Sequence, residues 1–130
     1  HQVSEMAKRF LGIFPRPAAM REMSRVYDLK SRLDWGEPAL TIIDIRDRYL
    51  FNESHVMGAI SMPMAELLER IQRALEYDRD IYIYSDTDEE AAEAANQLRT
   101  SGYKKVSVLR GGVAAWKAAD FQIETGMARI

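Results

Sequence analysis

The order of patterns along the chain predicts an α/β fold with a mostly parallel central sheet flanked by helices. Three apolar stretches rich in β-branched and aromatic residues, 40–45, 81–84 and 105–109, indicate buried strands. Segments with the apolar spacing of helices lie between them, and the connections are short. A chain of 130 residues with this alternation and no internal repeat is expected to form one domain with its own core.

The expected helices are defined by apolar stripes and by the residues at their ends. Ser24 is a suitable N-cap, Pro63 suits the first turn of a helix, and Gly102 follows a helix end. The predicted helices span residues 24–33, 64–76, 91–99 and 113–119. The last of these follows the turn formed by Gly111 and Gly112.

The remaining segments have weaker patterns. Residues 59–62 indicate a short strand, and residues 46–52 a polar loop with Tyr49, Leu50 and Phe51 turned inward or onto a neighbour. The stretch from residue 121 to 130 is weakly patterned. We therefore divide the chain into an N-terminal arm or tether (1–22), a domain (23–126) and a C-terminal tail (127–130).

The arm interleaves apolar residues with basic ones and contains two prolines that stop any helix. One interpretation is an amphipathic segment that makes peripheral contact with a membrane surface, or docks on a partner, through residues 1–22. The other is an arm packed on its own domain or a loose chain end, and this second interpretation is favoured because the segment is short.

Composition excludes several classes of function. The net charge is −2 and the basic residues are scattered, so no nucleic-acid partner is expected. No apolar run approaches the roughly 20 residues of a membrane span, and a soluble, cytoplasmic protein is expected. The chain contains no cysteine, which excludes disulfides, thiolate metal sites and every thiol-based mechanism.

The polar turn between the strand 81–84 and the following helix is the main candidate site. In α/β proteins, such turns present backbone N–H groups at a helix N-terminus, where anions bind and nucleophiles are placed. Here the turn places four carboxylates beside one hydroxyl nucleophile candidate, so negative charge fills a position suited to an anion. Its residues are Ser85, Asp86, Thr87, Asp88, Glu89 and Glu90.

Two motifs on either side of this turn resemble those of the rhodanese-like domain family. Residues 43–46 with 51–60 are similar to the family's "D-x-R … G-H-I-x-G-A-I" signature, and residues 108–116 resemble its closing "L-x-G-G-x-x-x-W" motif. The resemblance extends over residues 24–125 and implies a three-layer domain. It implies structural roles for Asp44, Arg46, His55, Gly58, Gly111, Gly112 and Trp116.

The sequence of the loop 85–90 differs from that of the active-site loop in the family. Active members have a cysteine directly after the strand, a glycine three residues later and often an arginine five residues later; these positions are Ser85, Asp88 and Glu90 here. A serine hydroxyl is not ionised near neutral pH and cannot carry a sulfane sulfur, and Glu90 would repel an anionic substrate. The resemblance therefore implies a noncatalytic domain without a cofactor, acting as a protein-interaction or regulatory module for an unidentified partner with a basic or polar surface.

Four alternatives stay open for the loop. Thr87 and Glu90 fit a capping box, which explains the acidic residues without any ligand. Carboxylates at Asp86, Asp88 and Glu89 or Glu90 could bind a divalent metal, and Asp86-Thr87-Asp88 also resembles the D-x-D of some phosphatases. A hydrolase using Ser85 would need His55 as its base, a role that ranks below a structural one.

Replacement of Ser85 by cysteine alone is expected not to give robust turnover of thiosulfate, because the carboxylates of Asp88 and Glu90 remain. The measurement is thiocyanate formation from thiosulfate and cyanide by Ser85→Cys, with an active rhodanese as positive control. Robust turnover by this single variant would refute our account of the loop.

Overall fold

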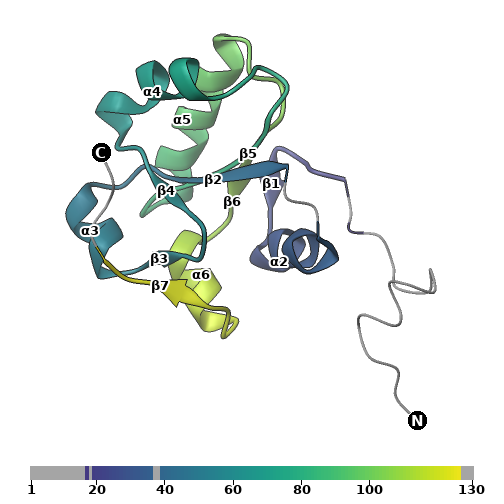
Figure 1. Cartoon of the computed structure of the whole chain (residues 1–130), viewed down its shortest axis with the longest axis vertical. Helices are drawn as coiled ribbons and strands as arrows, with labels where there is room; N and C mark the ends of the chain where they lie inside the picture. The colour runs from purple at the N-terminus through teal and green to yellow at the C-terminus, as the bar shows by residue number, and fades with distance from the viewer. Residues whose placement is uncertain (1–16, 18, 37–38, 127–130) are drawn as a thin grey trace.

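The computed structural model describes residues 17, 19–36 and 39–126, and its centre is a five-stranded sheet (Figure 1). The strands lie in the order β1-β6-β5-β2-β4, and every neighbouring pair is parallel. They are β1 (Met23–Ser24), β2 (Leu40–Asp44), β4 (Ile60–Ser61), β5 (Asp80–Tyr84) and β6 (Val106–Leu109). The predicted α/β class with a mostly parallel sheet is confirmed.

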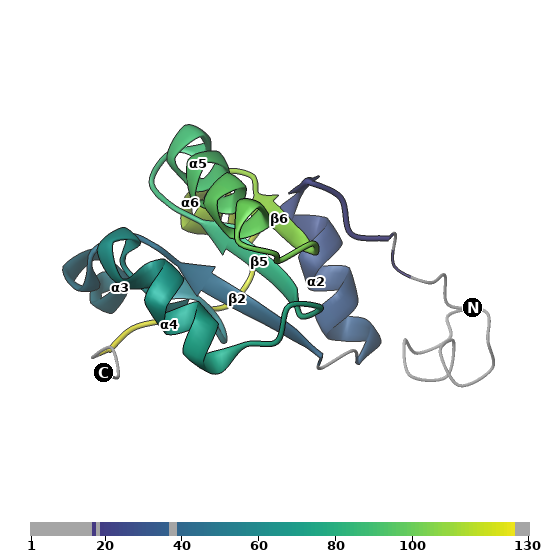
Figure 2. The same ribbon diagram turned by 90° about the horizontal axis from the view of Figure 1, so that it is seen from above.

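Helices cover both faces of the sheet and form three layers with it (Figures 1 and 2). On one face lie α4 (Leu67–Ala74) and α5 (Asp88–Thr100), and on the other α2 (Val26–Trp35) and α6 (Gly112–Ala118). Alternate residues of β5 serve the two faces: Ile81 and Ile83 pack with α4 and α5, and Tyr82 and Tyr84 pack with α2 and α6. Burial on both faces explains the almost continuous apolar runs of these strands.

A second, two-stranded sheet was not predicted from the sequence. Strands β3 (His55–Val56) and β7 (Ile123–Glu124) pair antiparallel, with His55 opposite Glu124. The weakly patterned stretch from residue 121 thus contains a strand. Strands of two residues are too short for an alternating pattern, and they form because distant segments meet.

The predicted loop at 46–52 was wrong, because helix α3 (Arg48–Glu53) occupies most of it. The Asp47 side chain caps this helix and accepts a hydrogen bond from the Leu50 backbone N–H at 3.0 Å. Phe51 is buried as expected, but Tyr49 is 71% exposed and does not turn inward. Asp47, an N-cap residue, is the sequence signal for this helix that our prediction did not use.

The predicted N-cap at Ser24 was also wrong. Ser24 belongs to β1, and its hydroxyl hydrogen-bonds the Ser107 hydroxyl at 2.5 Å across the β1–β6 pair. The N-cap of α2 is Arg25, whose backbone N–H donates to the Asp28 carboxylate at 2.9 Å. Arg25 has no side-chain acceptor for the N–H groups of the first turn, so only the reciprocal half of a capping box, from the Arg25 N–H to Asp28, is formed.

The two other long helices begin at residues different from those predicted. Residues 64–66 form a 3₁₀ turn, η1 (Met64–Glu66), before α4, and Leu75 is already extended. Helix α5 begins at Asp88, three residues before the predicted start, because its N-cap is Thr87.

Most of the predicted arm lies outside the described residues, since only 17 and 19–22 of the range 1–22 are described; the tail 127–130 also lies outside them. The backbone carbonyl of Glu22 accepts a hydrogen bond from the Val108 N–H at 2.8 Å, continuing the β1–β6 pairing. Among the described helices, none has the length and apolar character required to cross a membrane.

Substitution of Gly112 by alanine is expected to destabilise the domain more than the same change at Gly58. Both glycines have positive φ, at which an added side chain costs about 1–2 kcal/mol. At Gly112 the new Cβ would also lie 3.0 Å from the Ser85 carbonyl oxygen and 3.0 Å from Tyr84 Cδ1, whereas at Gly58 it would meet nothing within 4 Å. Urea unfolding of Gly112→Ala and Gly58→Ala measures the difference, and equal losses would contradict the importance of this close approach.

Candidate functional site

The candidate loop leaves the carboxyl end of β5, in the middle of the parallel sheet. Ser85 follows the buried Tyr84 directly and is partly buried, while Asp86 and Thr87 are exposed. The next residue, Asp88, is already in α5. The connection between strand and helix is therefore only three residues long.

Thr87 organises the start of α5. Its hydroxyl oxygen accepts a hydrogen bond from the Glu90 backbone N–H at 3.2 Å, and its hydroxyl donates to the Glu90 carboxylate at 3.1 Å. The prediction that Thr87 is the N-cap is confirmed. Glu90 lies at the position of the family's frequent arginine and takes part in this local contact.

Asp88 also has a structural contact. One oxygen of its carboxylate accepts a hydrogen bond from the Gly111 backbone N–H at 2.9 Å, which links the first turn of α5 to the turn before α6. The only described non-glycine residue with positive φ is Asp120, so Asp88 does not adopt that conformation. A helical start has replaced the glycine-dependent loop implied by the resemblance.

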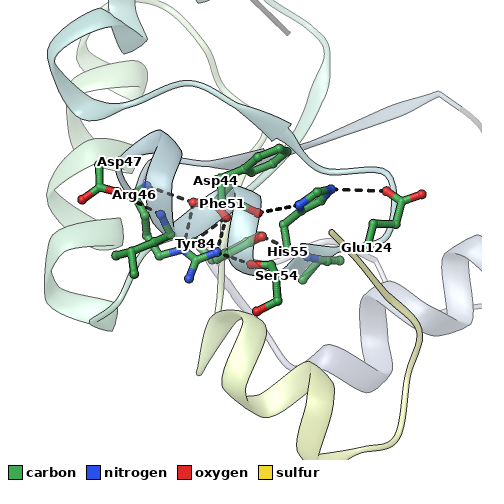
Figure 3. Close-up of polar contacts among 10 residues, drawn as sticks. Asp44, Arg46, Asp47, Phe51, Ser54, His55, Tyr84 and Glu124 are labelled. Carbon is green, nitrogen blue, oxygen red and sulfur yellow. Dashed lines mark hydrogen bonds and ion pairs between the residues drawn. The ribbon is translucent and has the colours of Figure 1, made fainter. Parts of the chain in front are cut away.

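Asp44 and Arg46 form a buried ion pair beside this loop (Figure 3). The Arg46 Nε donates to one Asp44 oxygen at 3.0 Å and Nη2 donates to the other at 2.7 Å; Nη2 also donates to the Ser54 carbonyl at 2.7 Å. Burial acts to lower the pKa of Arg46, but the hydrogen bonds and the negative charge of Asp44 outweigh it and raise that pKa. The Arg46 guanidinium is thus held in its charged form.

Tyr84 ties the end of β5 to the same cluster. Its hydroxyl oxygen accepts a hydrogen bond from the Val56 backbone N–H at 3.1 Å, and its ring faces the Arg46 guanidinium with its centroid 5.7 Å from Cζ. Burial, followed by the charge of Asp44, raises the pKa of Tyr84 far above its ordinary value. The phenol therefore stays neutral and serves as a fixed support for the strand that ends at Ser85.

Both ring nitrogens of His55 contact groups other than Ser85. Its Nδ1 hydrogen-bonds the Phe51 carbonyl at 2.8 Å, and because a carbonyl only accepts, Nδ1 carries a proton. Its ring stacks on Phe51, and Nε2 lies 3.5 Å from the Glu124 carboxylate (Figure 3). With both nitrogens directed to other groups, His55 does not serve as the base that the serine-hydrolase alternative requires. Sequence reasoning missed Glu124, since only the β3–β7 pairing brings it here.

The metal alternative also gains no support. In the described part of the chain, no group of three or more His, Cys, Asp or Glu side chains is arranged to hold a metal ion. Two of the candidate ligands are directed elsewhere, Asp88 to Gly111 and Glu90 to Thr87.

The other motif residues lie in turns and in the core. The Gly58 N–H donates to the Glu124 carboxylate at 2.9 Å, and Gly111 is the N-cap of α6 with φ 74°. Trp116 is fully buried, and its indole N–H donates to the Gln122 carbonyl at 2.7 Å. These contacts join β7 to the turn after β3, and α6 to the residue before β7.

Comparison with known proteins agrees with this geometry. The family described as "Rhodanese-like domain" matches residues 26–119. This chain belongs to that family. A crystal structure of the Alr3790 protein from Anabaena sp. is 50% identical and superimposes with a TM-score of 0.77, over 79% of this chain and 80% of that chain.

Two bacterial proteins illustrate the range of the family. The thiosulfate sulfurtransferase GlpE of Coxiella burnetii is 30% identical over 79 residues, which are 61% of this chain and 73% of GlpE. The uncharacterized protein YqhL of Bacillus subtilis is 29% identical over 75 residues, 58% of this chain and 59% of YqhL. The chain thus matches less than two thirds of the length of YqhL. Unlike an active member, it offers no cysteine for a persulfide.

Replacement of Arg46 by leucine is expected to destabilise the domain by about 3–5 kcal/mol, because the buried Asp44 carboxylate would lose its cation. The double variant Asp44→Leu/Arg46→Leu should lose less, since no unpaired charge is left. Chemical denaturation of both variants gives the comparison, with the exposed Arg73→Leu as a control that should change little. A double variant at least as unstable as the single one would contradict the assignment of the cost to the unpaired carboxylate.

Proposed function

We propose that this rhodanese-like domain is noncatalytic and acts by binding another protein through the surface of its former active-site loop. The observation that carries the proposal is the contact from the Asp88 carboxylate to the Gly111 N–H. In this contact the backbone N–H of Gly111, beside the nucleophile position, is already bonded to a negatively charged side chain of the domain itself. A cysteine-free loop with this contact has no thiolate, and one backbone donor that could face an anion is already bonded to a carboxylate.

The charge of the loop indicates the chemistry of the partner. Asp86, Glu89 and Glu90 are exposed, and no described residue forms an ion pair with Glu89 or Glu90. Asp86 lies near enough to Arg46 to help raise its pKa, but that guanidinium is already paired with Asp44. We therefore expect lysine or arginine side chains of the partner to meet these three carboxylates, which would set specificity and association rate.

The domain is expected to work without a cofactor, and the cytoplasmic location inferred from the sequence remains a prediction. The sulfurtransferase name of GlpE describes that relative. A shared fold does not imply that this chain has the activity of GlpE, because Ser85 occupies the nucleophile position here.

Reversal of the loop charges is expected to abolish partner binding. The variant is Asp86→Lys/Glu89→Lys/Glu90→Lys, and its matched control, Glu53→Lys/Glu76→Lys/Asp78→Lys, makes the same charge change at exposed positions elsewhere. Immobilised wild-type and control domains should retain the same discrete protein from an extract of the source cells, the charge-reversed variant should not, and retention should fall with rising salt because exposed charges are screened.

Two results would contradict the proposal. One is equal retention by the charge-reversed variant and the control, which would remove the loop from the interface. The other is thiocyanate formation by the wild-type domain from thiosulfate and cyanide, which would show a catalytic function. Circular dichroism of both triple variants checks that neither result comes from unfolding.

A further inference from the structure

A pocket of about 690 Å³ lies where the edge strand β4 of the large sheet meets the small β3–β7 sheet. Its walls come from α3, from both strands of the small sheet and from β4. Among the described residues that line it, none belongs to the loop 85–90. Phe51, Ala59 and Ile60 give it an apolar wall, and Ile60 is 42% exposed. The pocket is therefore a second place at which a ligand can contact the domain.

His55 and Glu124 present two hydrogen-bond acceptors to each other in this pocket. The bond to the Phe51 carbonyl requires a proton on Nδ1 of His55, so Nε2 of the neutral ring carries a lone pair. This nitrogen lies 3.5 Å from Oε1 of Glu124 (Figure 3). A lone pair and a carboxylate oxygen repel each other at this distance. The arrangement is favourable when a proton or a cationic donor binds both groups.

Ser61 adds a third polar atom to the same wall. It is 3% exposed, and within the described part of the chain its hydroxyl has no hydrogen-bond partner. A buried hydroxyl without a partner is unfavourable, because it has lost its bonds to water. The Glu124 carboxylate also has spare capacity. Its described hydrogen bond, from the Gly58 N–H at 2.9 Å, uses Oε1, the same oxygen that faces His55.

These polar groups match one class of ligand. Two acceptors and a hydroxyl, with the negative charge of one carboxylate, suit a compact cation that carries several N–H donors. A primary ammonium has three such donors and no acceptor. A divalent metal ion fits less well, since the described residues contain no suitable group of three or more His, Cys, Asp or Glu side chains. The apolar wall is suited to the methylene chain attached to an ammonium.

We propose that this pocket binds a primary alkylammonium group, carried either by a free amine or by a lysine side chain. The ammonium donates to Nε2 of His55, to the Glu124 carboxylate and to the Ser61 hydroxyl. The alkyl chain lies along Phe51 and Ile60. This inference does not depend on the proposed function, because the pocket and the acidic loop share no described residue.

The test is an NMR titration of the isotope-labelled full chain at neutral pH. The first probe is n-butylammonium, and n-butanol is the neutral control with the same alkyl chain. We expect saturable shifts of the Ala59, Ile60 and Glu124 amides with n-butylammonium and none with n-butanol over the same concentration range. Nα-acetyl-lysine methylamide separates the two sources. Saturable binding of this probe indicates a lysine side chain, and binding of n-butylammonium alone indicates a free amine.

Two substitutions test the groups that hold the ammonium. Glu124→Gln removes the charge but keeps an oxygen for the Gly58 N–H, and Ser61→Ala removes the hydroxyl. Each is expected to weaken binding of n-butylammonium by about tenfold or more, because each removes a hydrogen bond to a charged group. Glu76→Gln makes the same charge change at an exposed position outside the pocket and should leave binding unchanged. Dispersed amide spectra of the three variants check that they are folded.

Three results would overturn the proposal. The first is the absence of saturable shifts with n-butylammonium. The second is equal binding by Glu124→Gln and the wild-type domain. The third is a proton on both ring nitrogens of His55 in the ligand-free domain at neutral pH, measured from their NMR shifts, because Nε2 would then itself be the donor to Glu124. The charge-reversal experiment on the acidic loop changes none of these readouts.

Discussion

The buried ion pair between Asp44 and Arg46 is the interaction on which the carboxyl ends of the central strands depend. Two charges removed from water are tolerable only when each is fully hydrogen-bonded. Here the guanidinium reaches both Asp44 oxygens and the Ser54 carbonyl, and it lies over the Tyr84 ring. The pair thereby joins β2, the end of α3 and the end of β5, and it fixes the point where the loop at Ser85 begins.

Around this fixed point, the loop has been rebuilt as a helix start. Thr87 caps α5, and Asp88 bonds across to Gly111, so two backbone N–H groups near the nucleophile position are satisfied by side chains of the loop itself. Carboxylates in a first helical turn are also favoured by the helix dipole. The same acidic residues that we expect to repel an anion therefore stabilise the local structure, and the surface they leave is suited to cationic groups.

The sequence predicted those parts of the structure that depend on local patterns. Strands buried on both faces are apolar throughout, and Thr87 has a capping side chain, so β2, β5, β6 and the N-cap of α5 were predicted correctly. The two-residue strands β3 and β7 were missed because they are too short to show an alternating pattern of apolar side chains, and they form only by pairing with each other. The contact of His55 with Glu124 was missed for the same reason. Ser24 was misassigned because its hydroxyl is used between strands and not at a helix end.

The bond from Asp88 to Gly111 also bears on how this domain could change over evolutionary time. A path from this loop to sulfur chemistry would begin by acquiring a thiol, and we expect that thiol to bring no activity until the Asp88 carboxylate was removed. Removing the carboxylate first would cost stability and leave Gly111 without its acceptor, again with no catalytic return. Each single step is therefore expected to be neutral or harmful, so selection on one residue at a time does not readily lead from this loop to sulfur chemistry.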